Sequence, residues 1–216
     1  MTAILFDLDG TLLNTLEDLA DAVNATLAHF GCPERSLEEV RQFVGNGAER
    51  LIRLALPGKS DDPDVMQVLD WFVNYYAAHS QCKTRPYAGI PEALEEVKRE
   101  FPVAIVSNKP DNAVKILCGQ YFEGVYAVGE SSACARKPAP DMVFQAMNAI
   151  GADRCIYVGD SEVDVLTAKN ANVPCLSVLW GFRDREMIEE AGAAHFCPMP
   201  ADLLKCLKEM IEIYGK

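Results

Sequence analysis

Short apolar runs recur along the chain, each followed by polar or loop-forming residues. They are rich in branched side chains and too short for most helices, so the pattern predicts buried β-strands. These runs lie at residues 3–8, 103–107, 125–128, 155–159 and 175–179. Helical patterns lie between most of them, at residues 91–100, 112–121, 140–150 and 163–172. Such alternation predicts an α/β fold with a three-layer, Rossmann-like core, in which helices cover both faces of a parallel sheet.

The stretch between the first and second predicted strands contains only helical patterns and is too long for a simple crossover. One helical face there carries Leu16, Leu19, Ala20, Val23, Leu27 and Phe30. Ser36 and Glu39 form a capping-box pattern, and further helices are expected at residues 48–56 and 65–79. We therefore interpret residues 15–85 as an inserted helical-bundle cap, and residues 1–14 and 86–216 as the α/β core. We expect the cap over the carboxyl edge of the sheet, where open α/β folds bind ligands.

Composition limits the class of partner. The chain of 216 residues is half hydrophobic and 24% charged, which is typical of a packed globular protein. Its 20 basic and 32 acidic residues give a net charge of -12. This balance repels nucleic acid and anionic membrane surfaces, so we expect neither as a partner. An anionic substrate would then need local cations, amides or a metal ion.

The cysteines do not indicate a zinc site. All eight stand singly with no CxxC pair, and several lie in apolar runs, where a reduced thiol behaves as a small hydrophobic side chain. We find no signal peptide and no apolar run near ~20 residues, so a cytoplasmic location is expected.

The first predicted strand ends in FDLDGT. Because side chains alternate along a strand, Asp7 and Asp9 are expected to point to the same side. Such a pair can hold a hard cation while one carboxylate attacks phosphorus and the other exchanges a proton. Gly10 permits a sharp turn, and Thr11 offers a hydroxyl and an amide to a substrate. A simple polar turn is the alternative.

The fourth predicted strand ends in VGDSEVD, which places Asp160 at the same sheet edge and Asp164 one helical turn later. So many carboxylates in one place require a counter-charge, and a bound divalent cation supplies it. The alternative is that Asp160 only caps the next helix.

Two further segments carry candidate phosphate ligands. The second strand ends in Ser107, followed by Asn108 and Lys109, which together offer a hydroxyl and amides. Lys137 lies in RKPAPD, where two prolines stiffen the entry to a helix at the same edge. For both lysines a solvated side chain is the ordinary interpretation, and only the place of Lys137 just before a helix at this edge favours a role in the site.

The segments FDLDGT, VSNK, RKPAP and VGDSEVD resemble, in this order, the four motifs of the haloacid dehalogenase superfamily, and the likeness spans essentially the whole chain. The resemblance implies that Asp7 is the nucleophile and that Asp9 is the general acid, which later activates water. Ser107 and Lys137 would bind the transferring phosphoryl group. Mg²⁺ would be held by Asp7, the backbone carbonyl of Asp9 and Asp160, with Asp164 ordering the surrounding groups.

Within that superfamily the chain is most similar to phosphoglycolate phosphatases, through VGNGAERL, VSNKP and SVLWGF. The expected function is a magnesium-dependent phosphatase acting on a small phosphorylated metabolite. Another small-molecule phosphatase of the superfamily, or a phosphotransferase resembling β-phosphoglucomutase, is the alternative. A noncatalytic binding domain would predict a damaged set of acids and lysines, whereas this set is intact. Whether the protein is a monomer or a homodimer stays open.

Three residues are expected to contact the substrate: Thr11, Asn108 and Arg50. Arg50 follows the glycine-rich cap segment VGNGAE and could clamp a carboxylate, although an arginine on an amphipathic helix is more often solvated or paired. One departure from the superfamily pattern is Asn172, where a helix-ending glycine is common. Asn tolerates the left-handed conformation, so we expect the same helix end. The other departure, Asn14-Thr15, lies where the cap hinge should begin.

Overall fold

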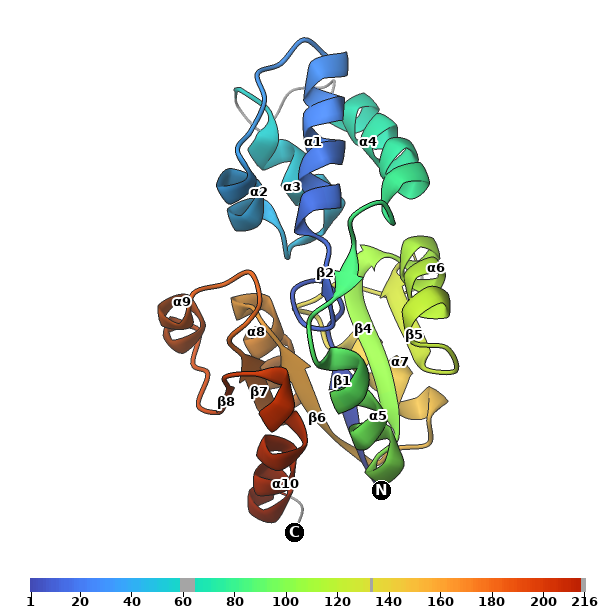
Figure 1. Cartoon of the computed structure of the whole chain (residues 1–216), viewed down its shortest axis with the longest axis vertical. Helices are drawn as coiled ribbons and strands as arrows, with labels where there is room; N and C mark the ends of the chain where they lie inside the picture. The colour runs from blue at the N-terminus through green and yellow to red at the C-terminus, as the bar shows by residue number, and fades with distance from the viewer. Residues whose placement is uncertain (59–64, 133, 215–216) are drawn as a thin grey trace.

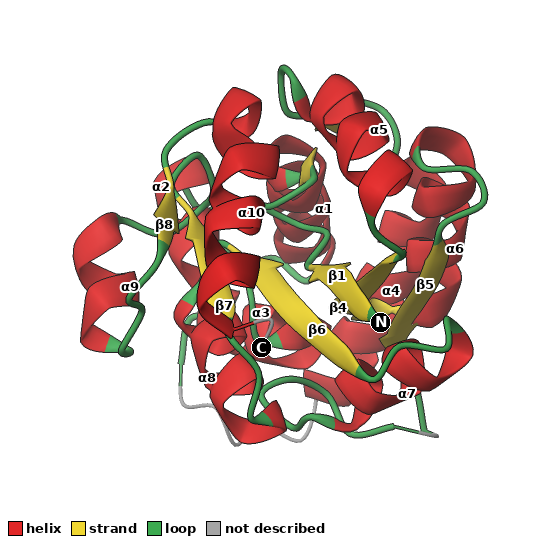
Figure 2. Ribbon diagram, turned by 90° about the horizontal axis from the view of Figure 1, so that it is seen from below, coloured by secondary structure: helices red, strands yellow, loops and turns green. Residues whose placement is uncertain are grey.

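A parallel sheet of six strands forms the centre of the computed structural model, which describes residues 1–58, 65–132 and 134–214. The strand order is β5-β4-β1-β6-β7-β8 (Figures 1 and 2). The strands are β1 (Thr2–Phe6), β4 (Val103–Pro110), β5 (Tyr126–Glu130), β6 (Arg154–Gly159), β7 (Cys175–Val178) and β8 (Phe196–Cys197). The predicted α/β fold class is therefore confirmed.

The alternation of side chains along β1 explains the three layers. Ile4 and Phe6 belong to one hydrophobic cluster, whereas Ala3 and Leu5 belong to another on the opposite face. The first cluster is completed by α5 (Ile90–Glu100), α6 (Asp111–Tyr121) and α10 (Leu203–Tyr214), and the second by α7 (Asp141–Ala149) and α8 (Glu162–Ala171). Figure 2 shows α5 and α10 on one side of the sheet, with α7 and α8 on the other.

Four helices lie together beyond one end of the sheet (Figure 1). They are α1 (Leu16–His29), α2 (Leu37–Phe43), α3 (Gly47–Ala55) and α4 (Val65–His79). They share a hydrophobic cluster of their own, which includes Leu19, Val23 and Leu27 of the predicted helical face. The capping box between Ser36 and Glu39 is confirmed at the start of α2. We call α1 to α4 the cap helices.

The chain passes between the core and the cap helices through a short antiparallel ribbon, which the sequence pattern did not indicate. Leu13 and Asn14 of β2 (Leu13–Asn14) pair with Pro86 and Arg85 of β3 (Arg85–Pro86). The ribbon lies at the two ends of the predicted insertion, and the division at residues 15 and 85 stays a prediction.

Several boundaries differ from the prediction. β1 ends at Phe6, before the predicted Leu8, and β4 continues past Ser107 to Pro110 with an irregular register. The elements after residue 179 were not predicted: β8 has only two residues and α9 (Arg185–Glu190) only six, which is too short for a clear pattern, and the 12-residue α10 was missed. Asn172 ends α8 with φ 56° and ψ 44°, which confirms the left-handed helix end. Among the described residues, no helix has both the length and the apolar character needed to cross a bilayer.

Candidate active site

Three buried aspartates meet at the carboxyl edge of the sheet. Asp7 follows β1 directly, and its backbone N–H donates to the carbonyl of Val158 on β6 over 2.8 Å. Asp160 and Asp164 follow β6, which is the neighbour of β1 in the sheet. Carboxylate oxygens of Asp7, Asp160 and Asp164 lie within 4.8 Å of one another, at residue exposures of 7, 2 and 0%. The structure thus brings together acids that the sequence separates by more than 150 positions.

The acid cluster holds more negative charge than its protein neighbours neutralise. Burial raises the pKa of Asp7 well above its ordinary value, although Lys137 opposes the shift. Burial and the charge of Asp164 raise the pKa of Asp160 to about 7. With all three carboxylates ionised, the single ammonium of Lys137 leaves two negative charges uncompensated. The cluster therefore fits a divalent cation in both charge and ligand type, since carboxylate oxygens are the donors that hard cations prefer.

Lys137 joins this cluster from the loop between β5 and α7. Its ammonium lies 2.8 Å from Oδ1 of Asp7 and 2.8 Å from Oδ1 of Asp164. Burial opposes its charge, but the carboxylates of Asp164 and Asp7 raise the pKa of Lys137, so the side chain is a fixed cation. Asp164 also accepts from the amide and hydroxyl of Ser161, the N-cap residue of α8. The alternative of a solvated Lys137 is wrong, because the residue is only 3% exposed.

Asp9 contacts a different lysine. The ammonium of Lys109 lies 2.8 Å and 3.0 Å from the two carboxylate oxygens of Asp9 and 4.8 Å from the ring centroid of Tyr76 on α4. Solvation was the ordinary interpretation of Lys109, and it is wrong, because this residue is 6% exposed. Sequence reasoning named Lys109 only as part of a candidate phosphate-binding segment, and it missed Tyr76. The position of Lys109 at a strand end was the only signal, and nothing in the pattern indicated its partner.

The remaining predicted core residues lie at the same place, with specific partners. The hydroxyl of Thr11 donates to Oδ1 of Asp160 over 3.1 Å. The hydroxyl of Ser107 accepts from the backbone N–H of Lys109 over 3.2 Å, and Ser107 lines the cavity described below. The side-chain oxygen of Asn108 accepts from the backbone N–H of Lys137. Its side-chain nitrogen donates to the backbone carbonyls of Lys137 and Gly45. Its amide therefore holds the Lys137 backbone and Gly45 together, and because Asn108 also lines the cavity, its expected contact with the substrate stays a prediction.

Backbone without side chains surrounds the Asp160 carboxylate. A Cβ placed on Gly10 would lie 2.3 Å from Oδ2 of Asp160, and one placed on Gly181 would lie 2.2 Å from the Asp160 Cβ. Gly10 also has φ +87°, which side chains rarely adopt. Only glycine fits at either position, so FDLDGT and the loop after β7 close tightly around one acid.

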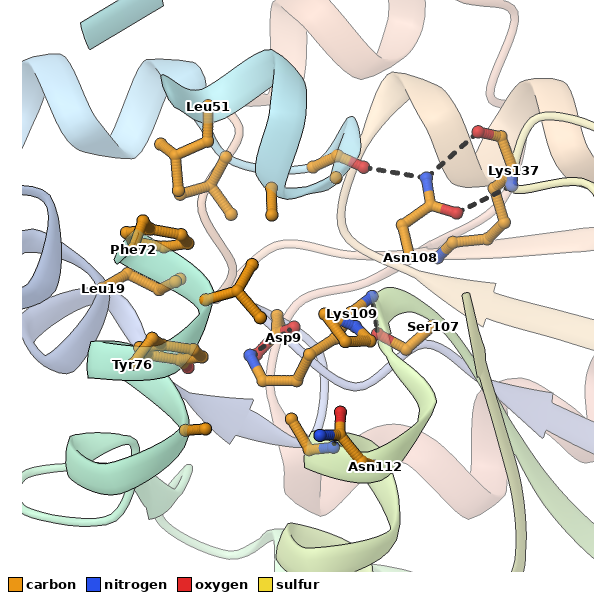
Figure 3. A pocket seen from close by; sticks show the side chains of 18 of the residues that line it. Asp9, Leu19, Leu51, Phe72, Tyr76, Ser107, Asn108, Lys109, Asn112 and Lys137 are labelled. Atoms are coloured by element: carbon orange, nitrogen blue, oxygen red, sulfur yellow. Dashed lines mark hydrogen bonds and ion pairs between the residues drawn. The ribbon is translucent and has the colours of Figure 1, made fainter. Parts of the chain in front are cut away.

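A cavity lies between this edge of the core and the cap helices. Its core side is polar and includes Asp7, Asp9, Ser107, Lys109 and Lys137. Its cap side is mainly apolar and carries Leu19, Val44, Ala48, Leu51, Phe72, Val73 and Tyr76. Figure 3 shows Leu19, Leu51 and Phe72 across the cavity from Lys109 and Ser107. A ligand here would place an anionic group against the core and its remainder against the cap.

This combination of fold and acid cluster coincides with a known family. Residues 4–178, most of the chain, match the haloacid dehalogenase-like hydrolase family. The chain belongs to this family. It is therefore a hydrolase, and the superfamily resemblance inferred from its four motifs is confirmed.

Relatives of this hydrolase carry more specific names. A protein of Pseudomonas aeruginosa named phosphoglycolate phosphatase 1 is 34% identical over 97% of this chain and 81% of its own length. A Mesorhizobium japonicum protein named phosphoglycolate phosphatase is 31% identical over 94% of this chain and 95% of its own. A crystal structure from Lactobacillus delbrueckii subsp. bulgaricus, provisionally named a phosphoglycolate phosphatase, superposes with a TM-score of 0.89 at 32% identity, covering 95% and 97% of the two chains.

The substrate contact predicted on the cap helices does not line the cavity. Arg50 lies on α3 with an exposed side chain, and it is absent from the described residues that line the cavity. Gly47, Ala48 and Leu51 of the same helix do line it. The helix therefore presents small and apolar groups to the ligand space, and its arginine faces elsewhere.

Proposed function

We propose that this hydrolase is a phosphatase that removes phosphate from a small phosphorylated metabolite, with 2-phosphoglycolate as the first candidate. The observation that carries the proposal is the position of the Asp7 carboxylate, which borders the cavity beside Lys137 and the other buried acids. The names of the relatives support the substrate, and the intact set of acids and lysines supports catalysis.

In the proposed reaction, an oxygen of Asp7 forms a bond to phosphorus while the bond from phosphorus to the ester oxygen breaks. The leaving alkoxide takes a proton from Asp9 and departs as the alcohol. A water molecule then attacks phosphorus in the phospho-aspartate, Asp9 takes its proton, and the phosphate leaves with Asp7 regenerated. Lys137, already fixed by Asp7 and Asp164, would hold the negative oxygens of the phosphoryl group through both steps.

We assign Mg²⁺ to the acid cluster, held by Asp7, Asp160 and the backbone carbonyl of Asp9, with Asp164 fixing Lys137 beside it. The two uncompensated charges and the oxygen donors support a hard divalent ion. When bound, this ion neutralises charge on the phosphoryl oxygens. Thr11 and the Phe182 amide, which both donate to Asp160, would keep that carboxylate oriented toward the ion.

A second candidate substrate class follows from the cap side of the cavity. Both lysines that line the cavity are already paired with carboxylates, and the cap contributes mainly apolar side chains. That surface favours a phosphate ester with a small apolar leaving group, whereas a carboxylated leaving group would need backbone amides or water as partners. Esters of the two classes can differ only in whether the leaving group carries a carboxylate, so their hydrolysis can be compared directly.

The test is phosphate release from a panel of purified esters, each with Mg²⁺ and with a chelator. The panel holds 2-phosphoglycolate, its analogue without the carboxylate, ethyl phosphate, a sugar phosphate and p-nitrophenyl phosphate. Magnesium-dependent release with 2-phosphoglycolate giving the highest kcat/KM would support the full proposal. A higher value for ethyl phosphate would select the apolar class, and absence of release from every ester would refute phosphatase activity.

A further inference from the structure

The loop between β7 and α9 connects the acid cluster with the cap helices. Trp180 donates from Nε1 to the carbonyl of Thr11 over 2.9 Å. The backbone N–H of Phe182 donates to Oδ2 of Asp160 over 2.7 Å, while its ring belongs to the hydrophobic cluster of the cap helices. One residue of this loop thus contacts an acid of the site through its backbone and the cap through its side chain.

Arg183, the next residue, belongs to the core, but its guanidinium contacts the cap helices. It is 6% exposed, and its guanidinium donates to the carbonyls of Arg41, Gln42 and Val44. These carbonyls lie at the end of α2, where the helix leaves such groups without internal partners. Nε of Arg183 also lies 2.9 Å from a carboxylate oxygen of Glu162 on α8, which fixes the guanidinium to the core. A side chain of the core therefore supplies hydrogen bonds to the carboxyl end of α2.

The segment that Arg183 reaches leads directly into the cavity wall. Val44, Gly45, Gly47 and Ala48 all line the cavity, and we call residues 44–48 the cap turn. A Cβ placed on Gly45 would lie 3.4 Å from the Arg183 guanidinium, so the turn packs against this side chain. The cap turn receives a second hydrogen bond from the core, because Asn108 donates to the carbonyl of Gly45 over 3.2 Å (Figure 3).

We infer that Arg183 is a positioning residue that holds the cap turn against the core and thereby sets the size of ligand that the cavity accepts. Four features support this: a buried cation, carbonyl partners at a helix end, an anchor on α8 and a turn that forms the cavity wall. The kinetic part of this inference rests on the proposed phosphatase function.

The kinetic test compares a small and a bulky phosphate ester. Arg183→Met should lower kcat/KM for 2-phosphoglycolate about tenfold or more, mainly through KM, since several charged hydrogen bonds to the turn are lost. Hydrolysis of p-nitrophenyl phosphate should change by no more than about twofold. Arg183→Lys should restore part of the loss, because an ammonium can still reach some carbonyls. Arg185→Met removes an exposed arginine of the same loop region and should match the wild type.

Amide hydrogen exchange tests the inference without any substrate. Exchange at residues 40–52 should be about tenfold faster in Arg183→Met than in the wild type or Arg185→Met, while β1 and β6 stay unchanged. Glu162→Gln keeps Arg183 but removes the negative charge that pairs with it. This variant should also speed amide exchange at residues 40–52 and raise KM for 2-phosphoglycolate, each by a smaller factor than Arg183→Met. This milder variant decides the question if Arg183→Met does not fold.

The outcomes separate the two proposals. If the wild type does not hydrolyse 2-phosphoglycolate, the substrate assignment fails, while faster exchange at residues 40–52 would still support Arg183 as the positioning residue. Unchanged exchange in the Arg183 and Glu162 variants would overturn the inference whatever the substrate is. Equal losses with both esters would overturn the selectivity it assigns.

Discussion

The ammonium of Lys109 lies 2.8 Å from Oδ1 and 3.0 Å from Oδ2 of Asp9, so one buried cation spans both oxygens of one carboxylate. This geometry fixes the plane of the carboxylate beside the cavity. The two acids of FDLDGT thus have different lysine partners, because Asp9 contacts Lys109 and Asp7 contacts Lys137. We therefore assign Lys109 to the orientation of Asp9 and Lys137 to the site of phosphoryl transfer.

Lys109→Met should test that division of roles. Loss of the ammonium frees Asp9 to rotate, and we expect kcat for phosphate release to fall about 10- to 100-fold, which is part of the ~10²- to 10⁴-fold that a positioned proton donor usually contributes. Lys115→Met is the matched control, because Lys115 pairs with Asp111 on the surface of α6. A wild-type kcat in Lys109→Met would show that Asp9 does not need this partner.

Asp7→Asn should abolish turnover without loss of the fold. The amide has the shape of the carboxylate but cannot attack phosphorus, so kcat should fall about 10⁴-fold or more. Since burial raises the pKa of Asp7, a neutral side chain is tolerated there, and the thermal midpoint without metal should not decrease. Kinetics and thermal unfolding of one preparation check both statements, and substantial residual phosphate release would remove Asp7 as the nucleophile.

Asp160→Asn should weaken Mg²⁺ binding. The variant replaces one of the three clustered carboxylates by a neutral amide, so the Kd from calorimetric titration should rise about tenfold or more. Asp153→Asn serves as the control, because Asp153 is exposed and pairs with the N-terminal ammonium. Equal affinities in the wild type and Asp160→Asn would exclude Asp160 as a ligand.

The same residue predicts how stability depends on pH in a chelator. Burial and the charge of Asp164 raise the pKa of Asp160 from 3.8 to about 7, so the folded state binds its proton more tightly than the unfolded state. The stability contributed by this group is complete below about pH 4 and is lost as the pH rises toward about 7. The thermal midpoint of the wild type minus that of Asp160→Asn should therefore fall across this range. A difference that grows with pH would contradict the assigned direction, and Mg²⁺ should raise the wild-type midpoint near pH 7.

Sequence reasoning located the acids because their positions follow from topology. Asp7 and Asp160 come directly after strands that are neighbours in a parallel sheet, so their place at one edge is fixed once the strands are recognised. The contacts of Lys109 with Tyr76 and of Arg183 with the end of α2 could not be obtained in this way, because each depends on how the cap helices dock on the core. That docking is set by contacts between residues far apart in the sequence, such as Arg183 with Val44.

The cap shows the same limit on a smaller scale. The capping box of α2 was predicted because Ser36 and Glu39 are three residues apart and interact locally. The side of α3 on which Arg50 lies was not predicted, since the hydrophobic pattern of a short helix does not indicate which polar residue borders a cavity. The ribbon of β2 and β3 was missed because two residues on each side carry no recognisable alternation.

Arg50 and Ala48 offer a paired test of which side of α3 meets the substrate. Ala48 lines the cavity, whereas Arg50, two residues later on α3, is exposed. Arg50→Ala should leave KM for both 2-phosphoglycolate and p-nitrophenyl phosphate within about twofold of the wild type, as expected of a surface change. Ala48→Leu adds bulk to the cavity wall and should raise KM about tenfold, more for the bulkier ester, with a smaller effect on kcat. If Arg50→Ala instead raised KM for 2-phosphoglycolate alone, the arginine would reach the substrate carboxylate during turnover, and the cap would have to adopt a second arrangement to bring it there.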